Sequence, residues 1–219
     1  MHEDILTRQA RFVEGVYCNE YEIRGHTYLI CDSIRNALLV SELLEDEEMS
    51  QDAKQFLLPA MVFVDLQEAI DTAGEDFWEV LLDACWSALG IDLDGRHNTT
   101  NEDAVIDFKQ DASRIRASFL QVYGMSFDDI SSKTSYIQFM GLIKGLLESG
   151  ESSLQQAVYY RTAKPPKRTK YNEEEIKAFR KKQEYYRIKT QTDKADSMKA
   201  QNNLMASAFS SEFNSAKRR

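Results

Sequence analysis

The distribution of charge changes at one point of this chain and limits what the chain can fold into. Residues 1–160 contain 11 Lys and Arg against 29 Asp and Glu, whereas residues 161–219 contain 16 against 7. Pro165 and Pro166 follow the change, and proline lacks a backbone donor and pushes the residue before it out of helical angles. We therefore predict an acidic helical domain over 1–160 and a basic C-terminal helix with a flexible tail over 161–219.

The composition is that of a folded protein. Hydrophobic residues make up 42% of the 219 residues and aromatic residues 11%, which is more than a disordered chain carries. No apolar run approaches the roughly 18 residues that a membrane span needs. The three cysteines are scattered, so we expect a reducing compartment without a disulfide framework.

The pattern of residues predicts a mainly α fold with one early β-hairpin. Two short β-prone runs flank Arg24 and Gly25 in "YEIRGHTYLI", and glycine supplies the positive φ of a tight turn. Helix-start residues then precede amphipathic runs at Asp32, Ser50 and Asp65. The expected fold is an acidic helical domain with a short N-terminal hairpin, followed by a basic tail that is partly helical or disordered.

The aromatic and aliphatic side chains between Arg114 and Glu148 predict a helical core. In "RIRASFLQVYGMSFDDI" they recur every three to four residues up to Gly124, and the next amphipathic run, "TSYIQFMGLIKGLLESG", repeats the pattern. We expect these side chains to pack against one another rather than to perform chemistry. The predicted core residues are Ile115, Phe119, Tyr123, Phe139 and Ile143.

No catalytic set is visible in the sequence. His2, His26 and His97 have no serine, cysteine or acid at a spacing that indicates a dyad or triad. The chain also lacks a glycine-rich phosphate loop and a nucleophile elbow. We expect no catalytic residue, no cofactor and no enzymatic activity.

The sequence offers two candidate metal sites, and the spacing of the residues favours neither. Cys18, His26 and Cys31 lack the C-x-x-C spacing of a zinc site. The segment "DLDGRHNTTNED" resembles a calcium loop, but Gly95 falls at the fourth position from Asp92, whereas an EF-hand has glycine at the sixth. We expect no metal.

The basic C-terminal part contains one clear helical segment. "NEEEIKAFRKKQEYYRIK" opens at Asn172 with acids in the first turn and gathers lysines and arginines later, which complements a helix dipole. Lysines interleaved with tyrosines can also contact phosphates and stack on bases, so nucleic acid is the less favoured alternative partner.

Several of these residues resemble the bacteriophage gene-product-fifteen family. The likeness covers roughly residues 16–188 and is strongest from 111 to 188. An aromatic helix ends in Tyr-Gly, a short acidic turn follows, and a Gly-Leu pair and a Tyr-Arg pair precede a basic helix. The positions in this sequence are Ala117, Phe119, Tyr123 and Gly124, then Asp128 and Asp129, Gly145 and Leu146, and Tyr160 and Arg161.

The resemblance implies a tail assembly chaperone of long-tailed phages. Such a protein would bind the tape measure protein in the host bacterial cytoplasm, keep it soluble while tail tube subunits assemble around it, and be absent from the mature virion. The tail tube protein is a second expected partner, membranes are not expected, and self-association is left open. We expect partner contacts from Tyr160, Arg161, Phe179, Tyr185, Tyr186 and Arg187.

Two other functions remain as alternatives. A minor structural component of the phage head or tail would stay in the finished particle. A nucleic-acid-binding regulator would act through the basic tail and lose affinity steeply as salt rises.

Overall fold

The computed structural model describes residues 11–97 and 105–189, apart from residues 14 and 151. It divides into two units: described residues up to 97 with 113–156 form the first, and 105–112 with 157–189 form the second. The fold class is confirmed, because the described chain is mainly helical with a small antiparallel sheet near its N-terminus. The predicted division after residue 160 stays a prediction, and the predicted tail beyond residue 189 lies outside the described residues.

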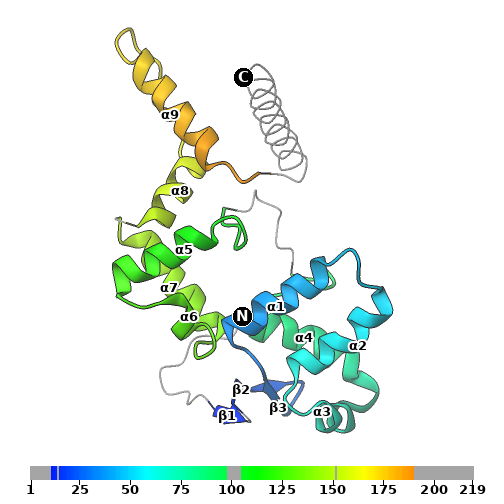
Figure 1. Ribbon diagram of the computed structural model, residues 1–219. Coiled ribbons are helices and arrows are strands. Elements are labelled where there is room, and N and C mark those ends of the chain that lie inside the picture. Colours follow the sequence, from blue (N-terminus) through cyan, green and yellow to red (C-terminus); the bar gives the residue numbers. More distant parts are fainter. Residues whose placement is uncertain (1–10, 14, 98–104, 151, 190–219) are drawn as a thin grey trace, which may run out of the picture. The chain divides into compact units, whose positions relative to one another are not determined.

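The first unit begins with a three-stranded antiparallel sheet in the order β1-β2-β3 (Figure 1). Its strands are β1 (Arg11–Val13), β2 (Val16–Ile23) and β3 (His26–Ile30). Arg24 and Gly25 form the turn with φ of 52° and 81°, and two positive φ angles match the type I′ hairpins that suit twisted strands. The predicted hairpin is therefore confirmed, and β1 extends it by a strand that the sequence did not indicate.

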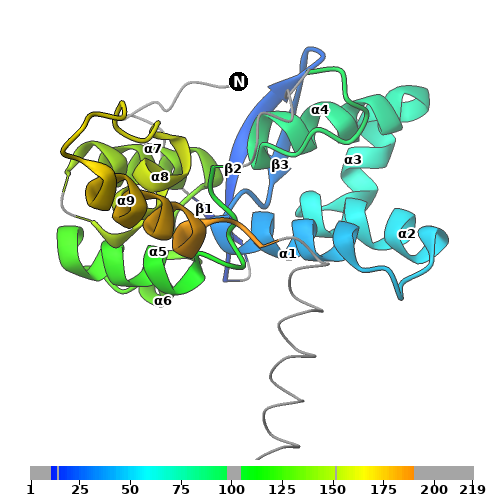
Figure 2. The same cartoon turned by 90° about the horizontal axis from the view of Figure 1, so that it is seen from above.

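One face of the hairpin is buried by helices. Tyr21 lies opposite Tyr28, and both are buried together with Ile23 and Ile30, as the two-residue alternation of a strand requires. Helix α4 (Phe77–Leu89) packs against β2, and helix α3 (Leu66–Ala73) contacts β3 (Figures 1 and 2).

Four helices follow the sheet. They are α1 (Ile34–Glu45), α2 (Gln51–Val62), α3 (Leu66–Ala73) and, after the 3₁₀ turn η1 (Gly74–Asp76), α4 (Phe77–Leu89). Ser50 and Asp65 cap α2 and α3 as predicted, each accepting a hydrogen bond from the backbone N–H three residues later.

The predicted cap at Asp32 is wrong by one residue. Ser33 caps α1, and its Oγ accepts the Asn36 N–H at 3.2 Å. Asp32 is fully buried instead. Its carboxylate accepts hydrogen bonds from the Tyr21 hydroxyl at 2.7 Å and from Asn19 Nδ2 at 2.9 Å, so it joins strand β2 to the start of α1.

A second group of helices completes the first unit. It comprises α5 (Ala112–Ser118), the π-helical turn η2 (Phe119–Tyr123), α6 (Phe127–Ile130), α7 (Tyr136–Glu148) and the start of α8 (Ser153–Thr162). Phe119 stacks on Phe139 with ring centroids 5.5 Å apart, and Phe127 meets both rings edge-on. Of the predicted core residues, Ile115, Phe119, Phe139 and Ile143 are buried and Tyr123 is half-buried.

Candidate partner-binding surface

The second unit is organised around Arg161, near the C-terminal end of α8. Its guanidinium binds the Asp111 carboxylate with two bonds, Nη1 to Oδ2 at 2.6 Å and Nη2 to Oδ1 at 2.8 Å. The Arg161 side chain is 8% exposed and that of Asp111 is 0% exposed. A two-pronged pair of this kind fixes orientation as well as distance.

Arg161 also binds the backbone of two other segments. It donates to the Val105 carbonyl at 2.8 Å and, through Nε, to the Tyr186 carbonyl at 2.6 Å. Tyr186 is the last residue of α9 (Glu173–Tyr186). One buried side chain thus joins α8, the end of α9 and the 105–111 turn.

Gln110 fixes the chain just after α9. Its side chain donates to the Lys189 carbonyl at 2.8 Å and accepts the Lys189 N–H at 2.8 Å. It also donates to Asp107 Oδ2 at 2.9 Å. The backbone direction at residue 189 is therefore set by a pair of hydrogen bonds.

Aromatic rings fill the contact between α8 and α9. We call Tyr159, Tyr160, Phe179, Tyr185 and Tyr186 the aromatic cluster. Tyr160 and Tyr186 stack with centroids 5.5 Å apart and planes 3° from parallel, and Phe179 meets Tyr160 edge-on at 5.3 Å. The ring centroid of Tyr159 lies 5.1 Å from that of Tyr160, and the ring centroid of Tyr185 lies 4.9 Å from that of Tyr186. Rings in such arrangements gain stability beyond the area they bury.

A lysine lies against the aromatic cluster. Lys182 Nζ donates to the Tyr160 hydroxyl at 3.0 Å and lies 5.0 Å from the centre of that ring. The hydrogen bond to Tyr160 raises the pKa of the Lys182 ammonium above its ordinary value, and a cation near an aromatic ring is attracted to the face of that ring.

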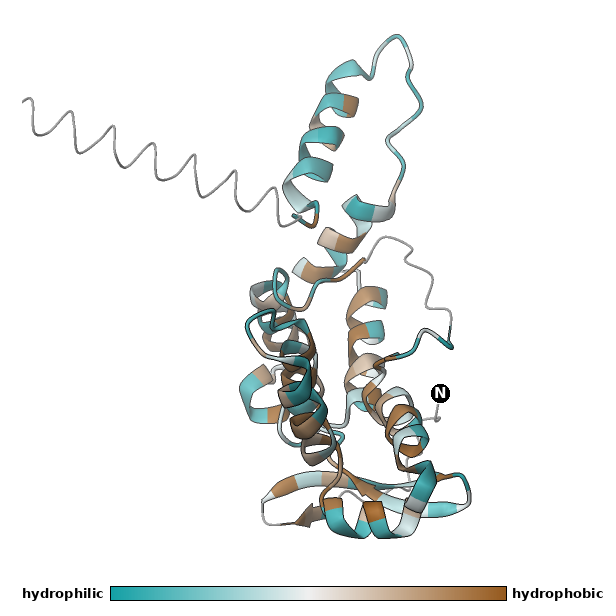
Figure 3. Cartoon of the chain, turned by 90° about the vertical axis from the view of Figure 1, so that its right-hand side faces the viewer, coloured by the Kyte–Doolittle hydropathy of each residue, from teal (hydrophilic) through white to brown (hydrophobic). Residues whose placement is uncertain are grey.

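The outer side of this contact combines exposed aromatic rings with cations. Tyr159 is 50% and Tyr185 71% exposed. Lys181 and Lys182 precede Tyr185 by four and three residues, so all three share one side of α9. Tyr159 of α8 contacts α9 through Phe179. We call the exposed residues around this contact, Tyr159, Lys181, Lys182 and Tyr185, the α8–α9 surface. Figure 3 shows that α9 is otherwise largely hydrophilic.

The comparison with protein families decides what kind of chain this is. The family described as "Bacteriophage Gp15 protein" matches residues 16–188. The chain belongs to the bacteriophage Gp15 family. The matched range runs from β2 to the residues just after α9. Comparisons with curated proteins and with solved structures gave no match.

The structure brings together most of the partner-binding residues predicted for this Gp15-family chain. Tyr160, Phe179, Tyr185 and Tyr186 meet in the aromatic cluster, whereas Arg187 forms an exposed ion pair with Glu184 at 3.4 Å. The Arg161 guanidinium is engaged within the chain. Whether any of these residues contacts a partner stays a prediction.

Sequence reasoning missed several residues of this Gp15-family unit, Tyr159, Asp111 and Gln110 among them. Tyr159 could have been found, because it adjoins Tyr160 and precedes Arg161 in "YYRT". Asp111 and Gln110 gave no such signal: Asp111 is 50 residues from Arg161 and Gln110 is 79 residues from Lys189.

The two candidate metal sites are described in part in this Gp15-family chain, because residues 98–103 lie outside the described residues. Cys18 and Cys31 are buried free thiols, and burial raises the pKa of the Cys31 thiol to about 11. Asp92 accepts backbone N–H groups of Gly95 and His97 and so organises a turn. Across the described ranges, no three His, Cys, Asp or Glu side chains come together in a way suited to a metal ion. Nor does any helix there have the length and apolarity of a membrane span.

Proposed function

We propose that this Gp15-family chain is a tail assembly chaperone that binds the tape measure protein. It would act in the host cytoplasm by binding alone, without catalysis, and would leave before the particle is complete. The tail tube protein, which takes over the same partner, is the second expected contact.

The α8–α9 surface is the observation that supports this proposal. Exposed tyrosines can cover apolar side chains of a partner at little conformational cost, while the two lysines favour a partner with acidic flanks. The aromatic rings beneath are locked by stacking and by the bonds of Arg161, so the surface is ordered before binding. A long helical protein that exposes apolar stripes until a tube encloses it is the kind of partner that fits.

Co-expression with the tape measure protein tests the proposal. We expect the long partner to stay soluble and to co-purify with the wild-type chain, and to do neither with the double substitution Tyr159→Ala and Tyr185→Ala. Tyr171→Ala is the matched control, because Tyr171 is 91% exposed and lies outside the α8–α9 surface. If the tape measure protein is equally insoluble with and without the wild-type chain, the chaperone proposal is wrong.

The same surface also supports a second candidate, the binding of single-stranded nucleic acid. Tyrosine rings stack on bases and lysines neutralise phosphates. In this case an oligonucleotide should bind the wild-type chain and lose affinity steeply between low and physiological salt. Binding that the Lys181→Gln and Lys182→Gln substitutions leave unchanged would exclude this candidate.

A further inference from the structure

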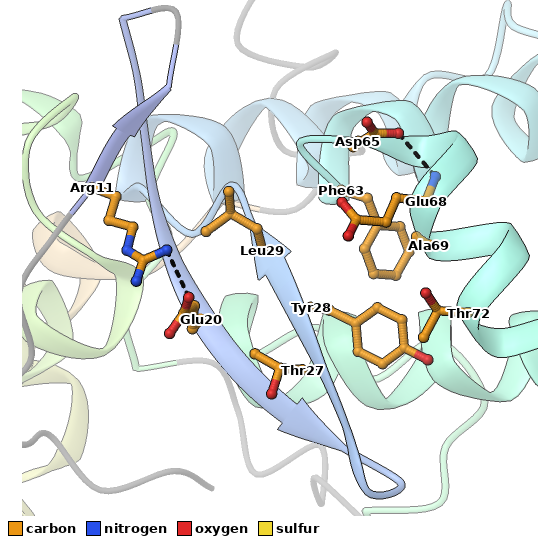
Figure 4. Close-up of a pocket in the computed structure, with 10 residues that line it drawn as sticks. All are labelled: Arg11, Glu20, Thr27, Tyr28, Leu29, Phe63, Asp65, Glu68, Ala69 and Thr72. Carbon is orange, nitrogen blue, oxygen red and sulfur yellow. Dashed lines mark hydrogen bonds and ion pairs between the residues drawn. The ribbon is translucent and has the colours of Figure 1, made fainter.

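A cleft of about 220 Å³ lies between β3 and α3 in the first unit (Figure 4). Its floor is apolar and formed by Phe63 and Ala69, both buried, with Leu29 beside them. The volume is that of a side chain rather than of a large ligand. This cleft belongs to a different unit from the α8–α9 surface, and no feature of the proposed function uses it.

The rim of the cleft is acidic. Glu20, Asp65 and Glu68 contribute carboxylates, and Arg11 is the one cation among the lining residues. Arg11 is already paired with Glu20 at 2.7 Å, which leaves Asp65 and Glu68 as the charge at the α3 end (Figure 4). Asp65 accepts the Glu68 N–H at 2.9 Å as the cap of α3, and a carboxylate has capacity for a further donor.

A buried hydroxyl without a partner lies in the same cleft. Tyr28 is 4% exposed, and its hydroxyl has no hydrogen-bond partner among the described residues. Figure 4 shows this hydroxyl on the α3 side of the cleft, beside Thr72. A buried polar group that lacks a partner destabilises the fold, so its retention points to a donor that arrives from outside.

We propose that this cleft binds a lysine or arginine side chain presented by another protein. The cation would donate to the Tyr28 hydroxyl within reach of Glu68, which lies one helical turn from Thr72, and Asp65 would add its negative charge farther along the rim. The aliphatic stem of the cation would rest on Phe63 and Ala69. Long basic side chains have this division into an apolar stem and a charged head. The charge of the rim favours a basic side chain as the occupant, because the rim carries three carboxylates and only one guanidinium.

A capped peptide, Gly-Ser-Lys-Ser-Gly, tests this directly on the full-length chain. In ¹H–¹⁵N spectra we expect saturable shifts at the amides of Thr27, Ala69 and Thr72, with binding about tenfold weaker for the same peptide carrying norleucine in place of lysine. Equal shifts with norleucine, or no saturable shift with lysine, would overturn the proposal.

Substitutions in the cleft identify the groups that hold the cation. Asp65→Asn keeps an oxygen for the helix cap, and combined with Glu68→Gln it should weaken lysine-peptide binding by about tenfold. Asp71→Asn combined with Glu75→Gln is the matched control: it also removes two carboxylates at α3 and the turn after it, and neither residue lines the cleft. An equal loss with the control would show a diffuse acidic field instead of a site.

Tyr28→Phe separates binding from stability. Removing a hydroxyl that has no partner should raise the urea midpoint of the free chain and weaken the lysine peptide. A lower midpoint would mean that the hydroxyl serves the fold, and would contradict the proposal. Shifts at Thr27, Ala69 and Thr72 that depend on protein concentration without peptide would show that a second copy fills the cleft, which also overturns it.

Discussion

Removing the Arg161 side chain is the change that we expect to weaken the second unit most. Its partner Asp111 is completely buried, and breaking a buried ion pair by deleting one member costs about 3–5 kcal/mol, because the other charge stays buried. Arg161→Ala also deletes the bonds to the carbonyls of Val105 and Tyr186. The cost should therefore appear where those bonds are, at the 105–111 turn and at the end of α9.

Hydrogen exchange followed by mass spectrometry measures this loss locally. The amides of α9 (Glu173–Tyr186) should exchange faster in Arg161→Ala by about two to four orders of magnitude, while those of α1 change little. Arg180→Ala is the matched control, because Arg180 is an exposed arginine on the same helix. It should change the opening free energy by less than about 0.5 kcal/mol.

A second pair of variants decides whether the ion pair is the cause. Asp111→Asn and Arg161→Met should each destabilise α9 nearly as much as Arg161→Ala does, and the two combined should cost clearly less than the sum of these two single changes. Additive costs, or α9 exchange that Arg161→Ala leaves unchanged, would refute the view that this pair holds the helix.

Three further changes test the first unit. Gly90→Ala should lower the unfolding free energy by more than about 1–2 kcal/mol, because Gly90 has φ of 67° and an added Cβ would lie 2.7 Å from Tyr136 Cζ; urea denaturation measures this. Phe119→Ala should cost about 3–5 kcal/mol in the same assay, because Phe119 is 0% exposed and stacked on Phe139. Burial raises the pKa of the Cys85 thiol from 9.0 to about 12, so the folded chain keeps a proton that the unfolded chain releases. The contribution of this proton to the free energy of unfolding is complete below pH 9.0 and is lost as the pH rises toward 12. In urea titrations across this pH range, the free energy of unfolding should therefore decline less steeply for Cys85→Ala than for the wild-type chain.

Local patterns in the sequence were sufficient for the elements whose causes are local. The Arg24–Gly25 turn, the caps at Ser50 and Asp65 and the end of a helix at Gly124 each depend on a few adjacent residues, and all were predicted. Periodicity placed Phe119 and Phe139 on apolar helix faces, but it could not show that their rings stack.

Contacts between distant residues, such as that of Arg161 with Asp111, were beyond such patterns. A local pattern could also predict the right element for the wrong reason. At the start of α9, Asn172 and the acids of the first turn predicted a capped helix start. In the structure Asn172 instead binds the turn before the helix, accepting the Thr169 N–H and donating to the Lys167 carbonyl. The helix begins at the expected place for a different reason.

The motif that most resembles the Gp15 family is explained by packing within the first unit. The Tyr123 hydroxyl donates to the Leu142 carbonyl at 2.8 Å, and an added Cβ on Gly145 would lie 2.5 Å from that hydroxyl. Gly124 ends the helix with φ of 65°. The Tyr-Gly and Gly-Leu pairs are thus linked by packing, because Tyr123 of the first pair lies over Gly145 of the second, where a larger side chain would clash. These positions are therefore explained by the fold, and the search for the partner should concentrate on exposed residues such as Tyr185, which is 71% exposed.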